Sequence, residues 1–174
     1  TMIRASTPYS IQFLINFSRK IEIGNTGYSL KIEDTVNSVL SEDISMTPYV
    51  VIERDGSPVE EGGLMYTYLG PVFSSTKDTY EKYDFDDIRE SSYQNKSLGG
   101  WVALIQHYFL SAWIPDQNEE YLYQGRYGEN SGRYSLGYTS RDSVLSYGET
   151  VSTKNTLYVG PKLPKQLVEI EENL

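Results

Sequence analysis

The sequence predicts a mainly β fold, an antiparallel β-sandwich with one amphipathic helix at the C-terminus. Two stretches, Tyr9–Phe17 and Tyr134–Tyr138, alternate apolar and polar residues with the period of two that half-buried strands show. The 174 residues include sixteen tyrosines but only three methionines. Because aromatic residues are enriched in strands, this composition favours pleated sheets over helix bundles. A chain of this length is expected to form one domain with a substantial core.

A second strand is expected directly after the first. The turn-like segment Gly24–Gly27 precedes Tyr28, Leu30 and Ile32, which share one face of a period-two pattern. Shorter runs of β-branched, aliphatic or aromatic residues predict three more strands, at Tyr49–Ile52, Leu64–Leu69 and Leu157–Val159.

The central segment Gly99–Pro115 is open to two interpretations. Its apolar residues include a helical stripe, but Gly99, Gly100 and Pro115 flank the segment and its aromatic content is high. We therefore expect two extended pieces that bend near Gln106 and His107. A run that is apolar on both faces is typical of the middle of a sandwich.

Two segments depart from the β pattern. Residues Ser75–Ser91 are polar and acidic, and they predict a loop that carries a helical turn or two. The C-terminus predicts a helix over residues 163–174, because Pro164 suits a first helical turn. Four apolar residues at spacings of four, three and four would form the docking face of this helix: Leu163, Leu167, Ile170 and Leu174. The expected organisation is a sandwich over residues 1–162 followed by this helix.

Composition excludes several classes of partner and chemistry. The net charge is -9 and the fifteen basic residues are scattered, which argues against nucleic acid and against anionic lipid surfaces. There are no cysteines, so disulfides, thiolate metal sites and cysteine nucleophiles are excluded. No apolar run approaches the roughly 20 residues of a membrane-spanning helix. No signal peptide opens the chain, so we expect Thr1 to lie inside a longer parent protein.

Candidate chemistry is sparse, and we expect no catalytic site, metal site or cofactor. His107 is the only histidine, and a histidine packed on or beside a sheet is the simpler interpretation. Residues Asp84–Asp87 resemble the start of a calcium loop but lack its glycine and its distal glutamate, which favours a solvated acidic loop. Glu119 and Glu120 are likewise expected to lie in a polar loop.

The aromatic residues of the central segment have two possible roles. Trp101, Tyr108, Phe109 and Trp113 either supply buried area to the core or line a groove for an apolar peptide or a polymer chain. The structural role is favoured, and an exposed contiguous patch would favour the groove.

Three sequence blocks carry a resemblance to a known family. They are YEKYDFD at Tyr80–Asp86, GGWVALIQHYFLSAWIP at Gly99–Pro115 and LYVGPK at Leu157–Lys162. In this order they resemble the periplasmic domain of the bacterial membrane protein insertase YidC, from about Gly63 to the C-terminus. The resemblance implies the C-terminal part of a β-supersandwich, placed in the periplasm beside the inner membrane, with a C-terminal helix that leads into the membrane domain.

The resemblance also implies a function. A non-catalytic domain of this family is expected to assist the insertion and folding of inner-membrane proteins. Its expected partners are Sec translocon accessory subunits, nascent membrane proteins and its own transmembrane domain. The alternative is a carbohydrate-binding or carbohydrate-modifying sandwich, because supersandwiches also occur in sugar-active enzymes.

Overall fold

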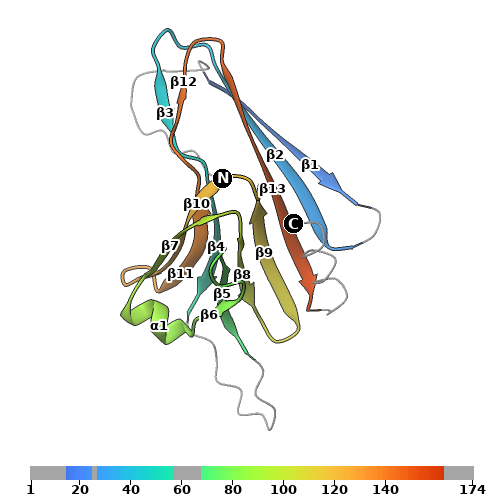
Figure 1. Ribbon diagram of the computed structural model, residues 1–174, viewed down its shortest axis with the longest axis vertical. Helices are drawn as coiled ribbons and strands as arrows, with labels where there is room; N and C mark the ends of the chain where they lie inside the picture. The colour runs from blue at the N-terminus through green and yellow to red at the C-terminus, as the bar shows by residue number, and fades with distance from the viewer. Residues whose placement is uncertain (1–14, 25–26, 57–67, 163–174) are drawn as a thin grey trace.

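The computed structural model describes residues 15–24, 27–56 and 68–162, and every element below lies in these ranges. They form thirteen strands and one short helix, arranged in antiparallel sheets (Figure 1). The prediction of a mainly β antiparallel fold is confirmed. The C-terminal helix predicted over residues 163–174 lies outside the described residues.

The larger sheet has seven strands, and each strand is antiparallel to its neighbours. Their spatial order is β1 (Ile15–Ile23), β2 (Ser29–Ser38), β13 (Thr150–Pro161), β9 (Phe109–Pro115), β8 (Trp101–Ile105), β5 (Gly70–Ser74) and β6 (Glu81–Lys82). The last long strand of the sequence, β13, therefore lies between β2 and β9 in the middle of this sheet.

Two smaller sheets and a helix complete the described fold. A four-stranded sheet has the order β4 (Tyr49–Asp55), β11 (Arg133–Thr139), β10 (Glu120–Gly128) and β7 (Tyr93–Leu98). A two-stranded sheet pairs β12 (Ser143–Leu145) with β3 (Ile44–Met46). The helix α1 spans Phe85–Glu90, and no described helix is long and apolar enough to cross a membrane.

The core between the two larger sheets is rich in aromatic side chains. Phe73, Val102 and Leu104 of the seven-stranded sheet pack against buried tyrosines of the four-stranded sheet. We call this side of the seven-stranded sheet its inner face. The Tyr123 hydroxyl donates a hydrogen bond to the Gly99 carbonyl at 2.8 Å. Tyr123 therefore supplies large apolar area while its hydroxyl is satisfied.

A second cluster lies on the opposite, outer face of the seven-stranded sheet. We call it the outer apolar cluster, and it comprises Val72, Ala103, Ile105, Leu110, Ala112 and Tyr158, all of which are buried. Strand β8 contributes alternate residues to the core and to this cluster. The prediction that the central segment is apolar on both faces is thus confirmed.

Several sequence predictions match the observed elements. The central segment forms β8 and β9, and the chain turns between them where the Gln106 N–H donates to the Phe109 carbonyl at 2.8 Å. The strand predicted at Tyr134–Tyr138 is β11, and the strand predicted at Tyr49–Ile52 is the first part of β4. The strand predicted around Leu30 is β2.

Other predictions need correction or lie partly outside the described residues. For the strand predicted at Tyr9–Phe17, residues 9–14 are not described, and β1 starts at Ile15 and runs on to Ile23. The segment Leu157–Val159 is only the end of the twelve-residue strand β13. Of Leu64–Leu69, the residues up to 67 are not described, and Tyr68 and Leu69 precede β5. Glu120 begins β10, so the predicted polar loop there is wrong for this residue.

The acidic segment Ser75–Ser91 contains the short helix that its pattern predicts. The Asp87 carboxylate accepts a hydrogen bond from the Asp84 N–H at 2.9 Å, as in a capping box at a helix start. Phe85 and Ile88 are buried, so α1 packs on the sandwich through one face. The prediction of a solvated acidic loop at Asp84–Asp87 is therefore wrong, because these residues form the cap and first turn of α1.

The buried tyrosines predict how stability depends on pH. Burial raises the pKa of Tyr123 and of Tyr138 above the ordinary value of 10.0. Above that pH the unfolded chain loses phenolic protons that the folded chain retains, so the free energy of unfolding should fall as pH rises. Each fully buried tyrosine can contribute up to about 1.4 kcal/mol per pH unit.

Urea unfolding between pH 8 and pH 11.5 checks this expectation. The change Tyr138→Phe removes one titrating group, so the free energy of unfolding should fall less steeply as pH rises. It also removes the hydrogen bond from the Tyr138 hydroxyl to Asn155 Oδ1 at 2.6 Å, at a cost of about 1 kcal/mol near pH 8. Tyr147→Phe, at a highly exposed position, is the matched control. An equal slope for both variants would contradict the prediction.

Candidate functional site

The inner face of the seven-stranded sheet is covered unevenly. One row of directly paired residues crosses six strands of this face: Phe73, Val102, Trp113, Leu157, Leu30 and Ile23. Exposure rises along the row, from 0% at Phe73 in β5 to 75% at Ile23 in β1. The four-stranded sheet therefore covers the β5–β8 side of this face and leaves the edge strand β1 exposed, whereas Ile32 and Val36 of β2 are buried (Figure 1).

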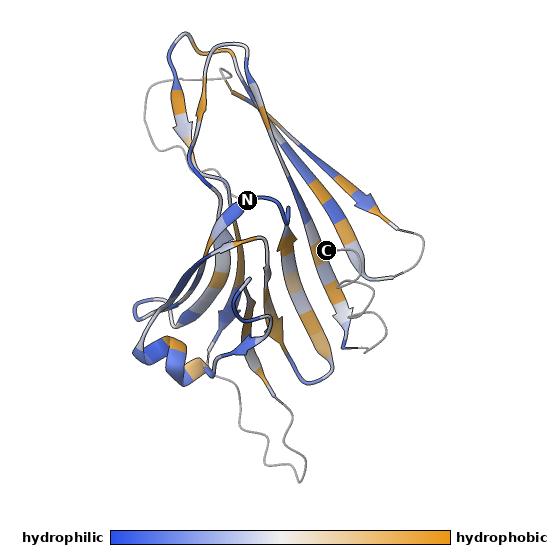
Figure 2. Ribbon diagram, in the orientation of Figure 1, coloured by the Kyte–Doolittle hydropathy of each residue, from blue (hydrophilic) through white to orange (hydrophobic). Residues whose placement is uncertain are grey.

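The accessible part of the inner face is apolar. We call it the inner apolar patch, and it comprises Ile21, Ile23, Leu30, Phe109, Leu157 and Val159. Four of these six side chains are among the most exposed large apolar residues of the described chain, for example Phe109 at 58% and Val159 at 50%. In Figure 2 hydrophobic and hydrophilic residues alternate along β1 and β2. Contiguous exposed apolar surface is a common feature of interaction sites.

A cavity opens on the same face, towards the opposite ends of these strands. It has a volume of ≈ 400 Å³ and lies where β1, β2 and β13 meet the segment that contains β3, β4 and β12. Its walls are mainly apolar and include Phe17, Val36, Met46, Leu145 and Val151. The volume falls within the range of sites that take small molecules or side chains of a partner.

A single ion pair separates this cavity from the inner apolar patch. Arg19 Nε and Nη2 donate hydrogen bonds to the two Asp34 carboxylate oxygens at 2.6 and 2.8 Å. The bond to Asp34 raises the pKa of the Arg19 guanidinium. The two charges satisfy each other in bidentate geometry, so the face combines two apolar regions with a neutral polar bridge.

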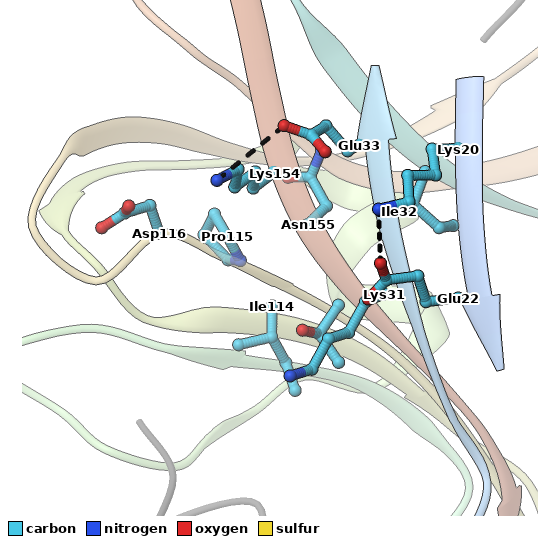
Figure 3. A pocket seen from close by; sticks show the side chains of 11 residues that line it. Lys20, Glu22, Lys31, Ile32, Glu33, Ile114, Pro115, Asp116, Lys154 and Asn155 are labelled. Carbon is cyan, nitrogen blue, oxygen red and sulfur yellow. Dashed lines mark ion pairs between the residues drawn. The ribbon is translucent and has the colours of Figure 1, made fainter. Parts of the chain in front are cut away.

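The outer face near β1 is polar instead. A cavity of ≈ 460 Å³ there is lined by side chains of alternating charge, including Lys20, Glu22, Lys31, Glu33 and Lys154 (Figure 3). A third cavity, of ≈ 720 Å³, has mainly acidic and hydroxyl groups in its wall. Among the described residues, no group of three or more histidine, cysteine, aspartate or glutamate residues is placed to hold a metal ion.

The aromatic residues singled out from the sequence do not form one cluster. Trp113 packs against the core between the sheets, whereas Trp101 packs against the outer apolar cluster. Tyr108 and Phe109 are exposed at the turn between β8 and β9. Only Phe109 belongs to the inner apolar patch.

His107 lies at the same turn. Its ring makes an edge contact with the ring of Tyr108, with 4.5 Å between the centroids. Its Nδ1 is buried and has no hydrogen-bond partner among the described residues. The predicted helix face, formed by Leu163, Leu167, Ile170 and Leu174, lies outside the described residues.

Sequence reasoning missed most of the inner apolar patch. The alternation that starts in the N-terminal segment continues through Ile21 and Ile23, and this continuation was the signal available for β1. The exposure of these residues had no signal in the sequence, because it depends on which strands the other sheet covers.

Comparison with known families decides where this fold belongs. Residues 13–174 match the model of the YidC periplasmic domain. The chain belongs to this family. The match starts at residue 13, so it extends well before Gly63, where the sequence blocks placed the start of the resemblance. Membership identifies the chain as a periplasmic domain of an inner-membrane protein.

Curated relatives of the family carry the name membrane protein insertase YidC. The protein from Actinobacillus succinogenes is 33% identical over 173 residues, which is 97% of this chain and 31% of the relative. The protein from Cellvibrio japonicus is 32% identical over 165 residues, 94% of this chain and 30% of the relative. The chain therefore spans less than a third of the length of these YidC relatives.

Solved structures with a similar fold include a glycosidase. The GH36 α-galactosidase AgaA from Geobacillus stearothermophilus superposes with a TM-score of 0.60 at 8% sequence identity. The superposition covers 84% of this chain and 22% of the galactosidase chain. At this identity the likeness concerns the fold alone, and the YidC family membership stands apart from it.

Proposed function

We propose that this chain is a non-catalytic periplasmic domain of a YidC-type membrane protein insertase, and that it assists the insertion and folding of inner-membrane proteins. In this proposal the inner apolar patch receives apolar segments of nascent membrane proteins. The observation that carries it is the exposure of Ile21, Ile23, Phe109 and Val159 on one face of one sheet. A segment that leaves the translocation path must shield apolar side chains from water, and this face offers a matching surface.

The non-catalytic part of the proposal is supported by the composition of the sites. The chain has no cysteine and one histidine, and the inner apolar patch contains no titratable side chain. The nearest charges, Arg19 and Asp34, are paired with each other. A sugar-active enzyme would need two carboxyl groups that face each other across a cleft, and this feature is not part of the patch.

We further propose contact with Sec translocon accessory subunits. This part is supported by family membership, and the partner surface would be sought away from the inner apolar patch, which the proposal assigns to the nascent chain. The strongly acidic balance of the chain, with net charge -9, would suit a partner surface of opposite charge.

The C-terminal segment is proposed to dock on the outer apolar cluster. We infer a sandwich over residues 1–162 and a helix over residues 163–174 that leads to the membrane domain. Strand β13 ends beside this cluster, because Gly160 pairs with Leu110 and the Lys162 N–H donates to the Tyr108 carbonyl at 2.8 Å. The stripe formed by Leu163, Leu167, Ile170 and Leu174 would then meet apolar residues such as Ile105 and Leu110.

Binding of an apolar segment tests the main proposal. The purified chain is expected to suppress the aggregation of a hydrophobic transmembrane peptide diluted from denaturant, as followed by light scattering. Val159→Asp places a charge in the inner apolar patch and should weaken the interaction about tenfold, since burying a valine contributes about 1.5 kcal/mol or more. Because Val159 is half exposed, the unfolding midpoint of this variant should differ little from that of the wild type.

Val144→Asp is the matched control. Val144 is 60% exposed, lies in β12 and is not part of the patch, so the same change should leave the suppression intact. Equal activity of the wild type and the Val159→Asp variant would exclude the inner apolar patch as the binding surface.

A further inference from the structure

Strand β1 forms an open edge of the seven-stranded sheet. It pairs with β2 alone among the described strands, and all nine of its residues are exposed. The strand contains neither proline nor glycine. Along such an edge alternate residues present unpaired N–H and C=O groups, which can pair with a further strand.

The outer face of this edge carries an ordered pattern of charge. Lys20 of β1 lies opposite Glu33 of β2, which in turn lies opposite Lys154 of β13. In the next row Glu22 lies opposite Lys31. Two ion pairs link these residues, Lys20 Nζ with Glu22 Oε1 at 2.6 Å and Lys154 Nζ with Glu33 Oε1 at 3.8 Å (Figure 3). Each row thus alternates in sign up to the edge.

We propose that β1 pairs antiparallel with β1 of a second copy of this chain, about a two-fold axis at Ile21. This register places Lys20 opposite the partner's Glu22 and Glu22 opposite the partner's Lys20. The row Lys154, Glu33, Lys20 then continues with the partner's Glu22 and the partner's Lys31, and its sign alternates without a break. The four charges at the junction form a square in which neighbours have opposite sign.

Charge selects this register over its neighbours. If the inner faces of both sheets lie on the same side, each inner-face residue of β1 must pair with an inner-face residue of the partner's β1. The two-fold axis then lies between the two copies of one β1 residue, and that residue defines the register. An axis at Lys20 would set two Lys20 side chains against each other, and an axis at Glu22 would do the same with two carboxylates. An axis at Arg19 would leave Lys20 opposite the partner's Ser18, without an opposite charge. Of these four registers, only the one with its axis at Ile21 sets opposite charges against each other across the junction.

The paired sheets would also join their inner faces. Ile21 of each copy would lie side by side on the axis, and Ile23 would lie opposite the partner's Arg19, so the junction on the inner face would combine apolar and charged side chains. This association goes beyond the proposed function and does not depend on it, because the junction is formed by β1 alone.

Sedimentation equilibrium of the full 174-residue chain tests the proposal. At low ionic strength the wild type is expected to form a dimer whose dissociation constant rises with salt. Lys20→Glu and Glu22→Lys should each weaken the dimer about tenfold or more, because each creates two like-charge contacts. An equimolar mixture of the two variants should restore association, since each carboxylate of one variant then faces an ammonium group of the other across the junction. Circular dichroism confirms that each variant is folded.

Lys154→Glu is the control. It makes the same charge change on the same face, two strands from the edge, and should leave the dimer intact. A wild-type chain that stays monomeric up to about 1 mM would overturn the proposal. A mixture that stays monomeric, or a control that weakens the dimer as much as Lys20→Glu, would overturn it as well. Association of β1 with an unrelated extended apolar peptide, insensitive to these charges, would assign the edge to a different occupant and contradict self-pairing.

Discussion

Replacement of Phe73 by alanine is expected to lower the free energy of unfolding by about 3–5 kcal/mol. Phe73 is fully buried in β5 at the centre of the core. Its ring stacks on Tyr93 with 3.9 Å between the centroids and meets the edge of Tyr83 at 6.0 Å. Truncation would leave a cavity that these rings cannot fill, because each is held by its own strand or by hydrogen bonds.

Urea unfolding followed by tyrosine and tryptophan fluorescence measures this loss. Phe109→Ala is the matched control, because Phe109 lies two strands away in the same sheet but is exposed. The control should change the free energy of unfolding by about 0.5 kcal/mol or less. Similar losses of unfolding free energy for the two variants would show that Phe73 does not stabilise the fold through its burial in the core between the sheets.

Gly100→Ala is the second change for which a large loss of stability is expected. Gly100 precedes β8 and has φ +96°, a conformation that residues with a side chain rarely adopt. A Cβ atom at this position would lie 2.3 Å from the Ser74 carbonyl oxygen, which belongs to the paired strand β5. The conformational cost and the displacement of β5 together should amount to about 2–5 kcal/mol.

Gly148→Ala separates these two contributions. Gly148 has φ +75°, but no atom lies within 4 Å of the position that its Cβ would take. Its replacement should therefore cost only the conformational part, about 1–2 kcal/mol. Thermal and urea unfolding of the two variants give the difference, and a loss at Gly148 as large as that at Gly100 would refute the steric argument.

Local patterns in the sequence predicted strands for two different reasons. The stretch Tyr134–Tyr138 was predicted because its residues alternate, and the two halves of Gly99–Pro115 were predicted because the segment is apolar on both faces and is flanked by glycine and proline. Strand β10 was missed, although Tyr121 and Tyr123 alternate there. Gly125 interrupts the pattern, because Ile88 and Phe73 lie 3.0 Å from where its Cβ would be. Close packing, and not a turn, requires glycine at this position.

The arrangement of strands had no local signal. Strand β13 lies between β2 and β9, which are separated from it by long stretches of sequence, so its position depends on pairing across the whole chain. The inner apolar patch follows from the same arrangement. Ile23 and Leu30 lie in consecutive strands, and Leu157 becomes their neighbour only when the distant strand β13 pairs with β2. Ile23 stays exposed and the two leucines half-buried, because the four-stranded sheet is narrower than its partner.

The placement of β13 determines how the domain responds to tension. Nine of its residues, Thr150–Tyr158, pair with β2, and seven, Asn155–Pro161, pair with β9. A pull on the end of β13 at Pro161 acts along the strand, so both ladders of hydrogen bonds are loaded in shear and must break together. A pull that lifts β1 away from the sheet edge instead opens its bonds one at a time, as a zipper opens. We therefore expect the domain to resist tension better at the end of β13 than at its open edge, and tension at Pro161 to be transmitted into the middle of the larger sheet.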